Sequence, residues 1–174
     1  VLDEPKVKTS DIVTNGIIIP DPEILSMLKD TKVTIQISYY GKYSRNADKI
    51  KALCDEAGVK CVIRYPDKKT WHDAGDLHFR GRSEKELTAQ MKRCGNICRN
   101  FQNGKLYFCP RASFGTKLGV PDNPNNFVDL TEDTDRNTLR RQIFELNQRK
   151  FIDACNFCDE GTDKCVPVPV AEQL

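Results

Sequence analysis

The sequence predicts an α/β fold that is followed by a small, cysteine-rich α+β region. Two observations support this prediction. Residues 11–63 alternate between the sequence patterns of strands and helices, and six of the eight cysteines fall into two groups beyond residue 93. Strand, helix, strand, helix, strand is the pattern of a parallel sheet with right-handed crossover connections. We therefore expect a parallel sheet first and a region organised around thiols after it.

A strand and a helix are predicted at the start of the chain. Residues 11–16 read Asp-Ile-Val-Thr-Asn-Gly, which is typical of a strand that ends in a loop. Asp21 is suited to cap a helix, because its carboxylate accepts a hydrogen bond from a free N–H of the first turn. Pro22 fits the first helical position, where its missing N–H is not needed. The helix that follows carries the apolar residues Ile24, Leu25 and Leu28.

A second strand, a second helix and a third strand are predicted next. Residues 32–38 alternate well enough for a strand, and Ser44 can cap the helix that follows. Gly58 is placed to end this helix, because glycine readily adopts a positive φ. Residues 59–64 then form the third strand. The apolar residues of the helix fall on one face: Ile50, Leu53, Cys54 and Ala57.

The pattern changes after the third strand. Residues 65–82 have the composition of a loop. Ser83 and Glu86 have the spacing of a capping box, in which each side chain bonds the backbone N–H of the other, so a short helix is predicted there. We therefore expect two domains, residues 1–82 and residues 83–174. In the second domain a turn-rich connection over residues 115–135 leads to a helix that begins near residue 136, and prolines mark an extended tail.

Composition and charge favour a soluble globular protein. The chain has 174 residues, with 39% hydrophobic residues, 30% charged residues and a net charge of +2. This balance indicates neither a nucleic-acid partner nor a membrane-surface partner. The sequence has no apolar run near the roughly 20 residues that span a bilayer and no secretory signal pattern. We expect a cytoplasmic protein, and the sequence does not indicate its oligomeric state.

A tight hairpin with a cysteine on each arm is the most informative local feature. Asn103 and Gly104 form the dipeptide that favours a two-residue type I′ turn, because both positions need a positive φ. Counting outward from the turn places Cys98 opposite Cys109. Directly opposed residues share one face of a sheet, with Cβ atoms about 5 Å apart. The hairpin therefore predicts that two sulfurs point toward one site.

The cysteine groups favour a metal centre over scattered structural thiols. Disulfides are rare in the reducing cytosol, so eight cysteines in such a chain need another explanation. An iron–sulfur cluster takes four thiolates from distant segments, whereas structural zinc more often uses two Cys-x-x-Cys pairs, and only Cys155 and Cys158 form such a pair here. We favour the cluster, with zinc, disulfides and reduced thiols as alternatives.

Two sets of segments carry a resemblance to a known family. The first set resembles the middle of the barrel of radical S-adenosylmethionine enzymes, and it comprises residues 14–16, 18–20 and 33–41. The second set resembles the auxiliary-cluster extension of those enzymes, of the SPASM or twitch type, and it comprises residues 94–98, 103–107, 109–111 and 154–158. Together the two sets extend over nearly the whole chain.

The resemblance implies a partial (β/α) barrel over residues 1–82 and a SPASM/twitch-like iron–sulfur domain over residues 83–174. In the intact enzyme it implies reductive cleavage of S-adenosylmethionine at a first cluster and hydrogen abstraction from a substrate, a small molecule or a peptide, by a 5′-deoxyadenosyl radical. The family binds its first cluster with a Cys-x-x-x-Cys-x-x-Cys motif. Cys94 and Cys98 have the first spacing, but the third position is Phe101, so the motif is absent. We therefore expect a C-terminal portion that does not cleave S-adenosylmethionine alone.

The expected ligands of an auxiliary cluster, most simply a single [4Fe–4S] cluster, follow from the hairpin and the Cys-x-x-Cys pair. They are Cys98, Cys109, Cys155 and Cys158. Cys94 also fits the spacing of the SPASM pattern and is a reserve ligand, while Cys165 is a weaker candidate. The alternative for Cys94 is a thiol at a helix end, packed against neighbouring apolar side chains.

Three polar residues at strand ends are candidates for contact with S-adenosylmethionine. Thr14, Asn15 and Ser38 lie where parallel α/β layers place ligand contacts, and the resemblance to the barrel favours this role. Turn formation and capping explain the same residues equally well.

Other polar residues and cysteines have simpler interpretations. His72 and His78 flank two aspartates and suggest a metal or acid–base cluster, but a loop with ordinary surface residues is the favoured interpretation. Cys54 and Cys61 lie in apolar patterns and are expected to be small buried hydrophobic residues. The rival function is a zinc- or iron–sulfur-binding interaction module without catalysis of its own.

Overall fold

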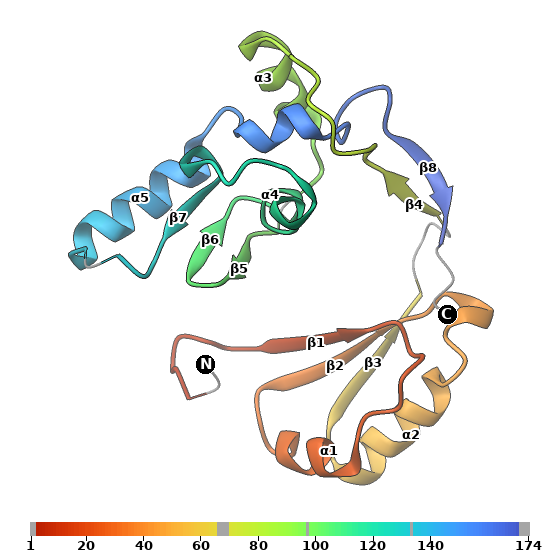
Figure 1. Ribbon diagram of the computed structural model, residues 1–174. Helices are drawn as coiled ribbons and strands as arrows, with labels where there is room; N and C mark the ends of the chain where they lie inside the picture. The colour runs from red at the N-terminus through yellow and green to blue at the C-terminus, as the bar shows by residue number, and fades with distance from the viewer. Residues whose placement is uncertain (1–2, 66–69, 97, 133, 171–174) are drawn as a thin grey trace. The chain divides into compact units, whose positions relative to one another are not determined.

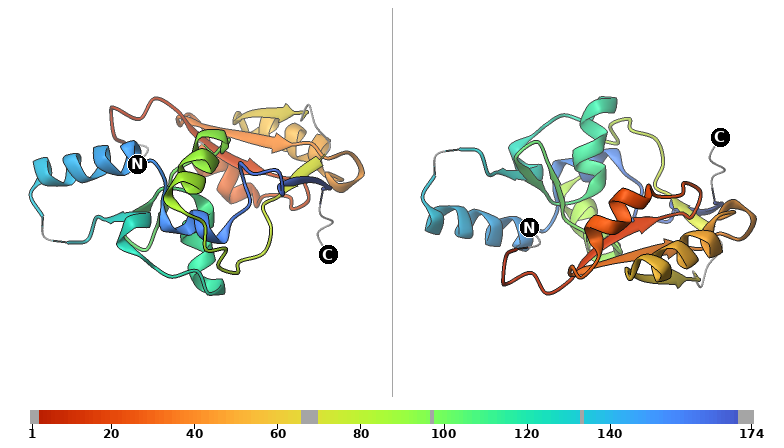
Figure 2. Two further views of the ribbon diagram at one scale, coloured as in Figure 1. Left: turned by 90° about the horizontal axis from the view of Figure 1, so that it is seen from above. Right: turned by 90° about the horizontal axis from the view of Figure 1, so that it is seen from below.

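The computed structural model describes residues 3–65, 70–96, 98–132 and 134–170, and it has a mixed α/β architecture with five α-helices and three small sheets (Figures 1 and 2). The chain divides into two compact units. The first comprises Val1–Trp71 together with Pro169–Leu174, and the second comprises His72–Val168. The division by contacts thus falls at residues 71 and 72, whereas the sequence placed a domain boundary between residues 82 and 83.

The first unit contains the parallel sheet that the sequence predicts. Its strands are β1 (Ser10–Thr14), β2 (Val33–Ser38) and β3 (Lys60–Arg64), in the order β1-β2-β3. Both pairs of neighbours are parallel. The crossovers contain α1 (Pro22–Leu28) and α2 (Ala47–Ala57), which lie on one face of the sheet (Figure 1). The α/β prediction for this part of the chain is confirmed.

The core of the first unit forms between this face of the sheet and the two helices. Ile37 on β2 and Ile50 on α2 are completely buried there. Asp21 caps α1 by accepting a hydrogen bond from the N–H of Glu23 at 2.8 Å, and Gly58 ends α2 with φ +72°. Both caps match the sequence prediction, so local signals determine where these helices begin or end.

The predicted cap of α2 is wrong. The helix begins at Ala47, and its N-cap Asn46 makes no side-chain capping bond. Ser44 instead ends a short 3₁₀ turn, where its hydroxyl accepts from the N–H of Tyr40 at 2.8 Å and donates to the carbonyl of Ser38 at 3.2 Å. A serine bonds backbone groups in turns as readily as at helix ends, and the sequence does not distinguish the two.

The second unit is built from short elements packed around a second core. Its helices are α3 (Glu84–Arg93), α4 (Pro110–Gly115) and α5 (Arg136–Gln148). Strands β5 (Asn100–Gln102), β6 (Lys105–Tyr107) and β7 (Phe127–Asp129) form an antiparallel sheet in that order. The most buried apolar side chains of this unit include Ala112, Val120, Leu146 and Ile152.

The hairpin and the capping box of the second unit agree with the sequence prediction. Phe101 pairs with Leu106 across the hairpin, and the turn residues Asn103 and Gly104 have φ of +51° and +77°. Ser83 and Glu86 form a reciprocal capping box at the start of α3. These features depend on two to four neighbouring residues, so sequence is sufficient to find them.

The predicted loop over residues 65–82 contains a strand. β4 (Thr70–Asp73) pairs with β8 (Val166–Pro169), which is almost one hundred residues away along the chain. Local composition does not reveal a strand whose partner is so distant. The strands of the described residues form three separate sheets and no closed barrel.

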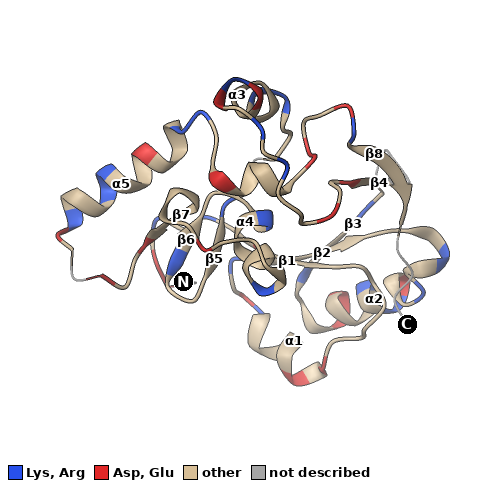
Figure 3. Cartoon of the chain, turned by 45° about the horizontal axis from the view of Figure 1, so that its top comes forward, with Lys and Arg blue, Asp and Glu red and all other residues tan. Residues whose placement is uncertain are grey.

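The described residues also bear on the exclusions drawn from composition. None of their helices has both the length and the apolar character needed to cross a membrane. Positive and negative side chains are interspersed along the elements of both units (Figure 3). The expectation of no nucleic-acid partner stays a prediction.

Candidate metal centre

The second unit contains a cavity of about 370 Å³ that is lined by four cysteines. They are Cys94, Cys109, Cys155 and Cys158, and apolar residues such as Met91, Phe108 and Ile152 form much of the remaining wall. Three separate segments of the chain contribute the thiols. The cavity thus brings together soft ligands from distant positions, as a thiolate-bound metal centre requires.

Helix α3 delivers Cys94. The residue is the C-cap of the helix, and its N–H donates to the carbonyl of Gln90 at 2.9 Å. Gly161, with φ +79°, lies directly against this helix end, where an added Cβ would come within 2.8 Å of the backbone nitrogen of Cys94. Only a glycine lets the loop that follows Cys158 approach so closely.

The start of α4 delivers Cys109. The residue is the N-cap of the helix, and Pro110 occupies the first helical position. The sulfur of Cys109 accepts a hydrogen bond from the N–H of Ala112 at 3.4 Å. Such N–H to sulfur bonds favour the thiolate, which is the form that binds metals.

The Cys-x-x-Cys segment is held by side chains from α3 and from the chain before it. Gln90, which is 3% exposed, donates from Nε2 to the carbonyls of Cys155 at 3.3 Å and Cys158 at 2.9 Å. Arg82 donates to the same two carbonyls through Nη1. The sulfur of Cys158 accepts a hydrogen bond from the N–H of Glu160 at 3.4 Å. These bonds fix the backbone on which two thiols are mounted.

A buried asparagine connects the segments that carry Cys109 and Cys155. The carbonyl of Asn126 accepts from the N–H of Phe108 at 2.9 Å, and its side-chain oxygen accepts from the N–H of Ala154 at 2.9 Å. Each donor immediately precedes one of the cysteines. Asn126 is completely buried, so it sets the spacing of the two segments without a competing bond to water.

Arg111 lines the cavity and connects two backbone segments near it by hydrogen bonds. Its guanidinium donates to the carbonyl of Phe157 at 3.0 Å and to carbonyls of the 74–76 loop. The positive charge also lowers the pKa of Cys158, although burial raises it by more. The cavity thus has one guanidinium in its wall to offset the charge of several thiolates.

Burial dominates the electrostatics of the cysteines. It raises the pKa of Cys155 to about 12 and also raises the pKa values of Cys109 and Cys158. Neighbouring cysteines raise these values further, because like charges repel. Without a cation the thiols of Cys109, Cys155 and Cys158 therefore stay protonated at neutral pH. A bound metal would supply the positive charge that four thiolates need.

The spacing of the sulfurs distinguishes between kinds of metal centre. Within the described part of the chain, no three of the four cavity cysteines have sulfurs that all lie within 4.8 Å of one another. A single zinc ion with Zn–S bonds of ~2.3 Å would hold its sulfurs ~3.8 Å apart. A cluster with a separate iron for each thiolate holds them further apart. The sulfurs of these cysteines are therefore not preset for a single zinc ion, and some of them would have to move to bind one.

Cys98 is outside this cavity. It is exposed and is not among the described residues that line the site. The ladder of the hairpin ends at the pair of Asn100 and Tyr107, so its register does not extend to Cys98 and Cys109. Beyond it, the guanidinium of Arg99 lies 3.9 Å from the ring centroid of Phe108 and donates to its carbonyl. Side-chain contacts replace strand pairing here, and the cavity lining includes Cys94 but not Cys98.

The other three cysteines are also separate from the cavity lining. Cys54 and Cys61 are buried in the core of the first unit, as expected. The thiol of Cys165 donates to a carboxylate oxygen of Glu160 at 3.2 Å. Of the sequence candidates in the second unit, the structure therefore gathers Cys109, Cys155, Cys158 and the reserve ligand Cys94.

The candidates in the first unit lie at the carboxyl edge of its sheet. Thr14 and Ser38 are the last residues of β1 and β2, which are neighbours. Thr14 accepts from the N–H of Gly16 at 3.3 Å, and Asn15 accepts from the N–H of Ile17 at 3.2 Å. The side chains of Thr14 and Asn15 thus take part in turn formation. Contact of Thr14, Asn15 and Ser38 with S-adenosylmethionine stays a prediction.

Sequence reasoning missed the residues that hold the cysteines in place. Arg82, Gln90 and Asn126 are of types found throughout protein surfaces, and nothing in their sequence context marks them as buried. The cysteines could be recognised as candidate ligands from their residue type and from their spacing in the sequence. Their supporting hydrogen bonds depend on tertiary contacts and had no such signal.

Comparisons with known proteins do not assign the chain to a family. No protein-family model matches it, and no curated protein matches it. The functional proposal therefore depends on the donor set, on the cavity and on the resemblance described above.

Proposed function

We propose that this chain binds an auxiliary [4Fe–4S] cluster through Cys94, Cys109, Cys155 and Cys158, as the C-terminal part of a radical S-adenosylmethionine enzyme. The observation that carries the proposal is the gathering of four thiols from three segments around one cavity. The donor set is purely thiol, which suits iron–sulfur clusters and zinc and excludes hard cations such as Mg²⁺.

Among the described residues, the cavity thiols are not preset for a single ion. The sulfurs are too far apart for ~2.3 Å bonds to one zinc ion without rearrangement. The hydrogen bonds from Gln90 and Arg82 to the carbonyls of Cys155 and Cys158 hold the backbone of this segment in place. The apolar wall also suits a buried cluster, because burial and N–H bonds to sulfur tune its reduction potential.

Complete ligation by protein points to a supporting role in the reaction. Four cysteines provide one thiolate for each iron, so no iron would be left open for substrate or S-adenosylmethionine. A cluster of this kind, when it is bound, would serve in electron transfer. The roles of this chain's residues are to hold the four sulfurs apart, exclude water from them and stabilise the thiolates by N–H bonds.

The first unit would contribute part of the barrel in the intact enzyme. Its sheet is parallel, and the edge strand β1 exposes Ile12 and Val13, which are 45% and 66% exposed. A further strand would pair with the backbone edge of β1, and layers packed on the two faces of the sheet would cover these side chains. Thr14, Asn15 and Ser38 are the proposed contacts for S-adenosylmethionine at the carboxyl edge.

Anaerobic reconstitution of the full chain with iron and sulfide tests the cluster. We expect a brown protein with broad visible absorption and about four irons and four sulfides per chain. Cys155→Ser should lose most of the bound iron. Cys98→Ser is the matched control, because it removes an exposed thiol outside the cavity, and it should retain wild-type iron content.

Two results would overturn the proposal. The first is a colourless protein that binds one zinc ion through four sulfurs, which favours the rival function of a zinc-binding interaction module. The second is loss of iron in Cys98→Ser with retention in Cys94→Ser, which would restore the ligand set expected from the hairpin alone.

A further inference from the structure

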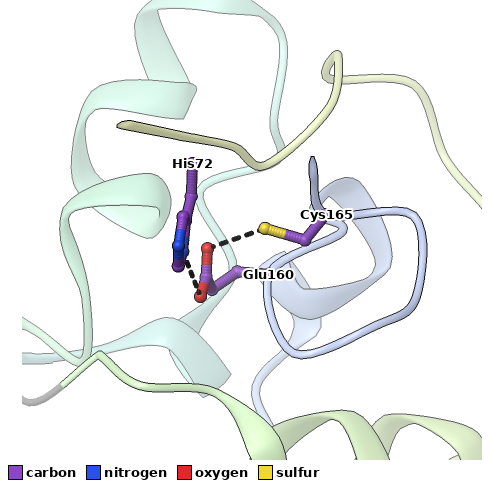
Figure 4. A group of neighbouring side chains, drawn as sticks. All are labelled: His72, Glu160 and Cys165. Atoms are coloured by element: carbon purple, nitrogen blue, oxygen red, sulfur yellow. Dashed lines mark hydrogen bonds and ion pairs between the residues drawn. The ribbon is translucent and has the colours of Figure 1, made fainter. Parts of the chain in front are cut away.

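A second group of metal-binding side chains lies in the same unit, outside the set of four cysteines. One ligand atom from each of His72, Glu160 and Cys165 lies within 4.8 Å of the other two. The three side chains point toward one another (Figure 4). His72 Nδ1 is 3.6 Å from one carboxylate oxygen of Glu160, and the Cys165 thiol donates to the other at 3.2 Å.

The fold brings these residues together from distant positions. His72 lies on β4, and Cys165 immediately precedes β8, the strand that pairs with β4. Glu160 lies in the turn that follows the Cys-x-x-Cys segment. The turn is anchored through Asp159, whose N–H donates to the carbonyl of Ala74 at 2.7 Å. Its carboxylate accepts hydrogen bonds from the guanidinium groups of Arg80 and Arg82.

We propose that His72, Glu160 and Cys165 bind a zinc ion, with a ligand set that shares no residue with the four cavity cysteines. One imidazole nitrogen, one carboxylate oxygen and one thiolate form a mixed donor set that suits a borderline divalent cation. Their separations need only adjustments of ~1 Å to reach the ~3–4 Å expected around tetrahedral zinc. The wider spacing of the four cavity cysteines does not meet this condition.

The proposed site keeps one coordination position open. Three protein ligands leave a tetrahedral ion one position for water or another small ligand, in contrast to a closed structural site. The side chain of His72 is 55% exposed, so solvent reaches the site. On binding, Cys165 releases its thiol proton to solvent and its sulfur bonds to the ion, so neither oxidant nor reductant is needed.

Glu160 connects the two sites of the unit. Its N–H donates to the sulfur of Cys158, and the residue is part of the wall of the cavity. A zinc ion on its carboxylate would therefore fix the turn that also supports a cavity cysteine. The proposal does not depend on the nature of the metal in the cavity, because its donor set is different.

Zinc-edge X-ray absorption of the full chain tests the site directly. The samples are wild-type protein reconstituted with iron and sulfide, and the Cys155→Ser variant without iron, each with one equivalent of zinc added. We expect one sulfur and otherwise nitrogen or oxygen neighbours around zinc in both samples. A shell of four sulfurs that disappears in Cys155→Ser would place zinc in the cavity and overturn the proposal. Absence of bound zinc in both samples would overturn it as well.

Substitutions at two of the three ligands provide an independent check by calorimetric titration with zinc. His72→Ala and Cys165→Ser should each weaken zinc affinity by about tenfold or more. The matched controls are His78→Ala, which removes an exposed histidine of the same segment, and Cys98→Ser. Both controls should bind zinc as the wild type does. Equal affinity in His72→Ala, Cys165→Ser and the controls would contradict the assignment, and so would a sulfur neighbour that persists in Cys165→Ser.

Discussion

The side-chain amide of Gln90 donates to the carbonyl oxygen of Cys158 over 2.9 Å, and Gln90 lies on the same helix that ends at Cys94. One helix therefore delivers a thiol and also fixes the segment that carries two others. Local signals placed the helix, through its capping box, but only the fold places Gln90 against the Cys-x-x-Cys segment. Because of this hydrogen bond, the segments that carry Cys94 and Cys158 are held together before any metal binds.

Replacing Gln90 with leucine should destabilise the protein and weaken iron–sulfur binding. The substitution keeps an apolar stem but removes one of the two side-chain donors to these carbonyls, since Arg82 still bonds both, so each lost hydrogen bond should cost about 1 kcal/mol. We expect a lower urea midpoint for the metal-free chain and slower cluster reconstitution. Gln148→Leu, at the exposed end of α5, is the control and should change neither. Wild-type reconstitution by Gln90→Leu would show that the carbonyl bonds do not position the cysteines.

Gly161→Ala should be one of the most damaging single-methyl additions in the second unit. The residue has φ +79°, and its added Cβ would collide with the backbone at Gln90 and Cys94. The collision separates the turn from the end of α3, so iron content should fall together with stability. Gly119→Ala is the matched control, because φ there is +101° but nothing lies within 4 Å of the added Cβ. The control should show only the backbone strain, about 1–3 kcal/mol at most. Equal effects of the two variants would refute the close approach at Gly161.

The buried ion pairs of Asp159 should make stability depend on pH in the acid range. Hydrogen bonds from Arg80 and then Arg82 lower the pKa of Asp159 from 3.8 to about 2. Because the folded value lies below the unfolded value, the stabilisation is complete above about pH 4 and is lost as the pH falls toward 2. Asp159→Asn should therefore cost about 2 kcal/mol in urea unfolding at pH 7, and its deficit relative to wild type should shrink between pH 4 and pH 2.

A surface ion pair provides the control for the Asp159 prediction. Asp163 pairs with Arg93 at 3.1 Å, but its side chain is 95% exposed. Exposed pairs of this kind contribute between zero and about 1 kcal/mol, so Asp163→Asn should leave the urea midpoint nearly unchanged. A deficit of Asp159→Asn that stayed constant down to pH 2 would show that the effect is not electrostatic.

The sequence was sufficient where a feature depends on neighbouring residues. The parallel α/β pattern, the cap at Asp21, the Asn103-Gly104 turn and the capping box at Ser83 follow from intervals of a few residues. The hairpin keeps the predicted register, but its ladder ends at the pair of Asn100 and Tyr107, and next to it the Arg99 side chain bonds the carbonyl of Phe108 instead. Extrapolating strand pairing past its last hydrogen-bonded pair is therefore unsafe.

Features that join distant segments were beyond sequence reasoning. The pairing of β4 with β8 and the approach of His72 to Glu160 connect positions almost ninety or more residues apart. Tertiary packing brings them together, and no periodicity or spacing encodes the match. The same holds for Asn126, whose bond to the N–H of Ala154 connects two short 3₁₀ turns that have no common sequence pattern.

Alkylation of thiols, followed by mass spectrometry, should separate the eight cysteines into classes. In the native metal-free chain at pH 8, Cys98 should react first because it is exposed. Cys61 and Cys155 should react last, because burial raises the pKa of each to about 12 and leaves roughly one thiolate in ten thousand. Cys54 shares the core of Cys61 and should be similarly protected.

Reconstitution with iron and sulfide should change this pattern at the cavity alone. Cys94, Cys109, Cys155 and Cys158 should become unreactive once their sulfurs are bound, whereas Cys98 should react at its original rate. The comparison of Cys94 with Cys98 is decisive, because the cavity lining favours the former and the hairpin pattern favoured the latter. Protection of Cys98 with continued reaction of Cys94 would contradict the ligand set drawn from the cavity. Unfolding in urea supplies the reference, because all eight thiols should then react at similar rates.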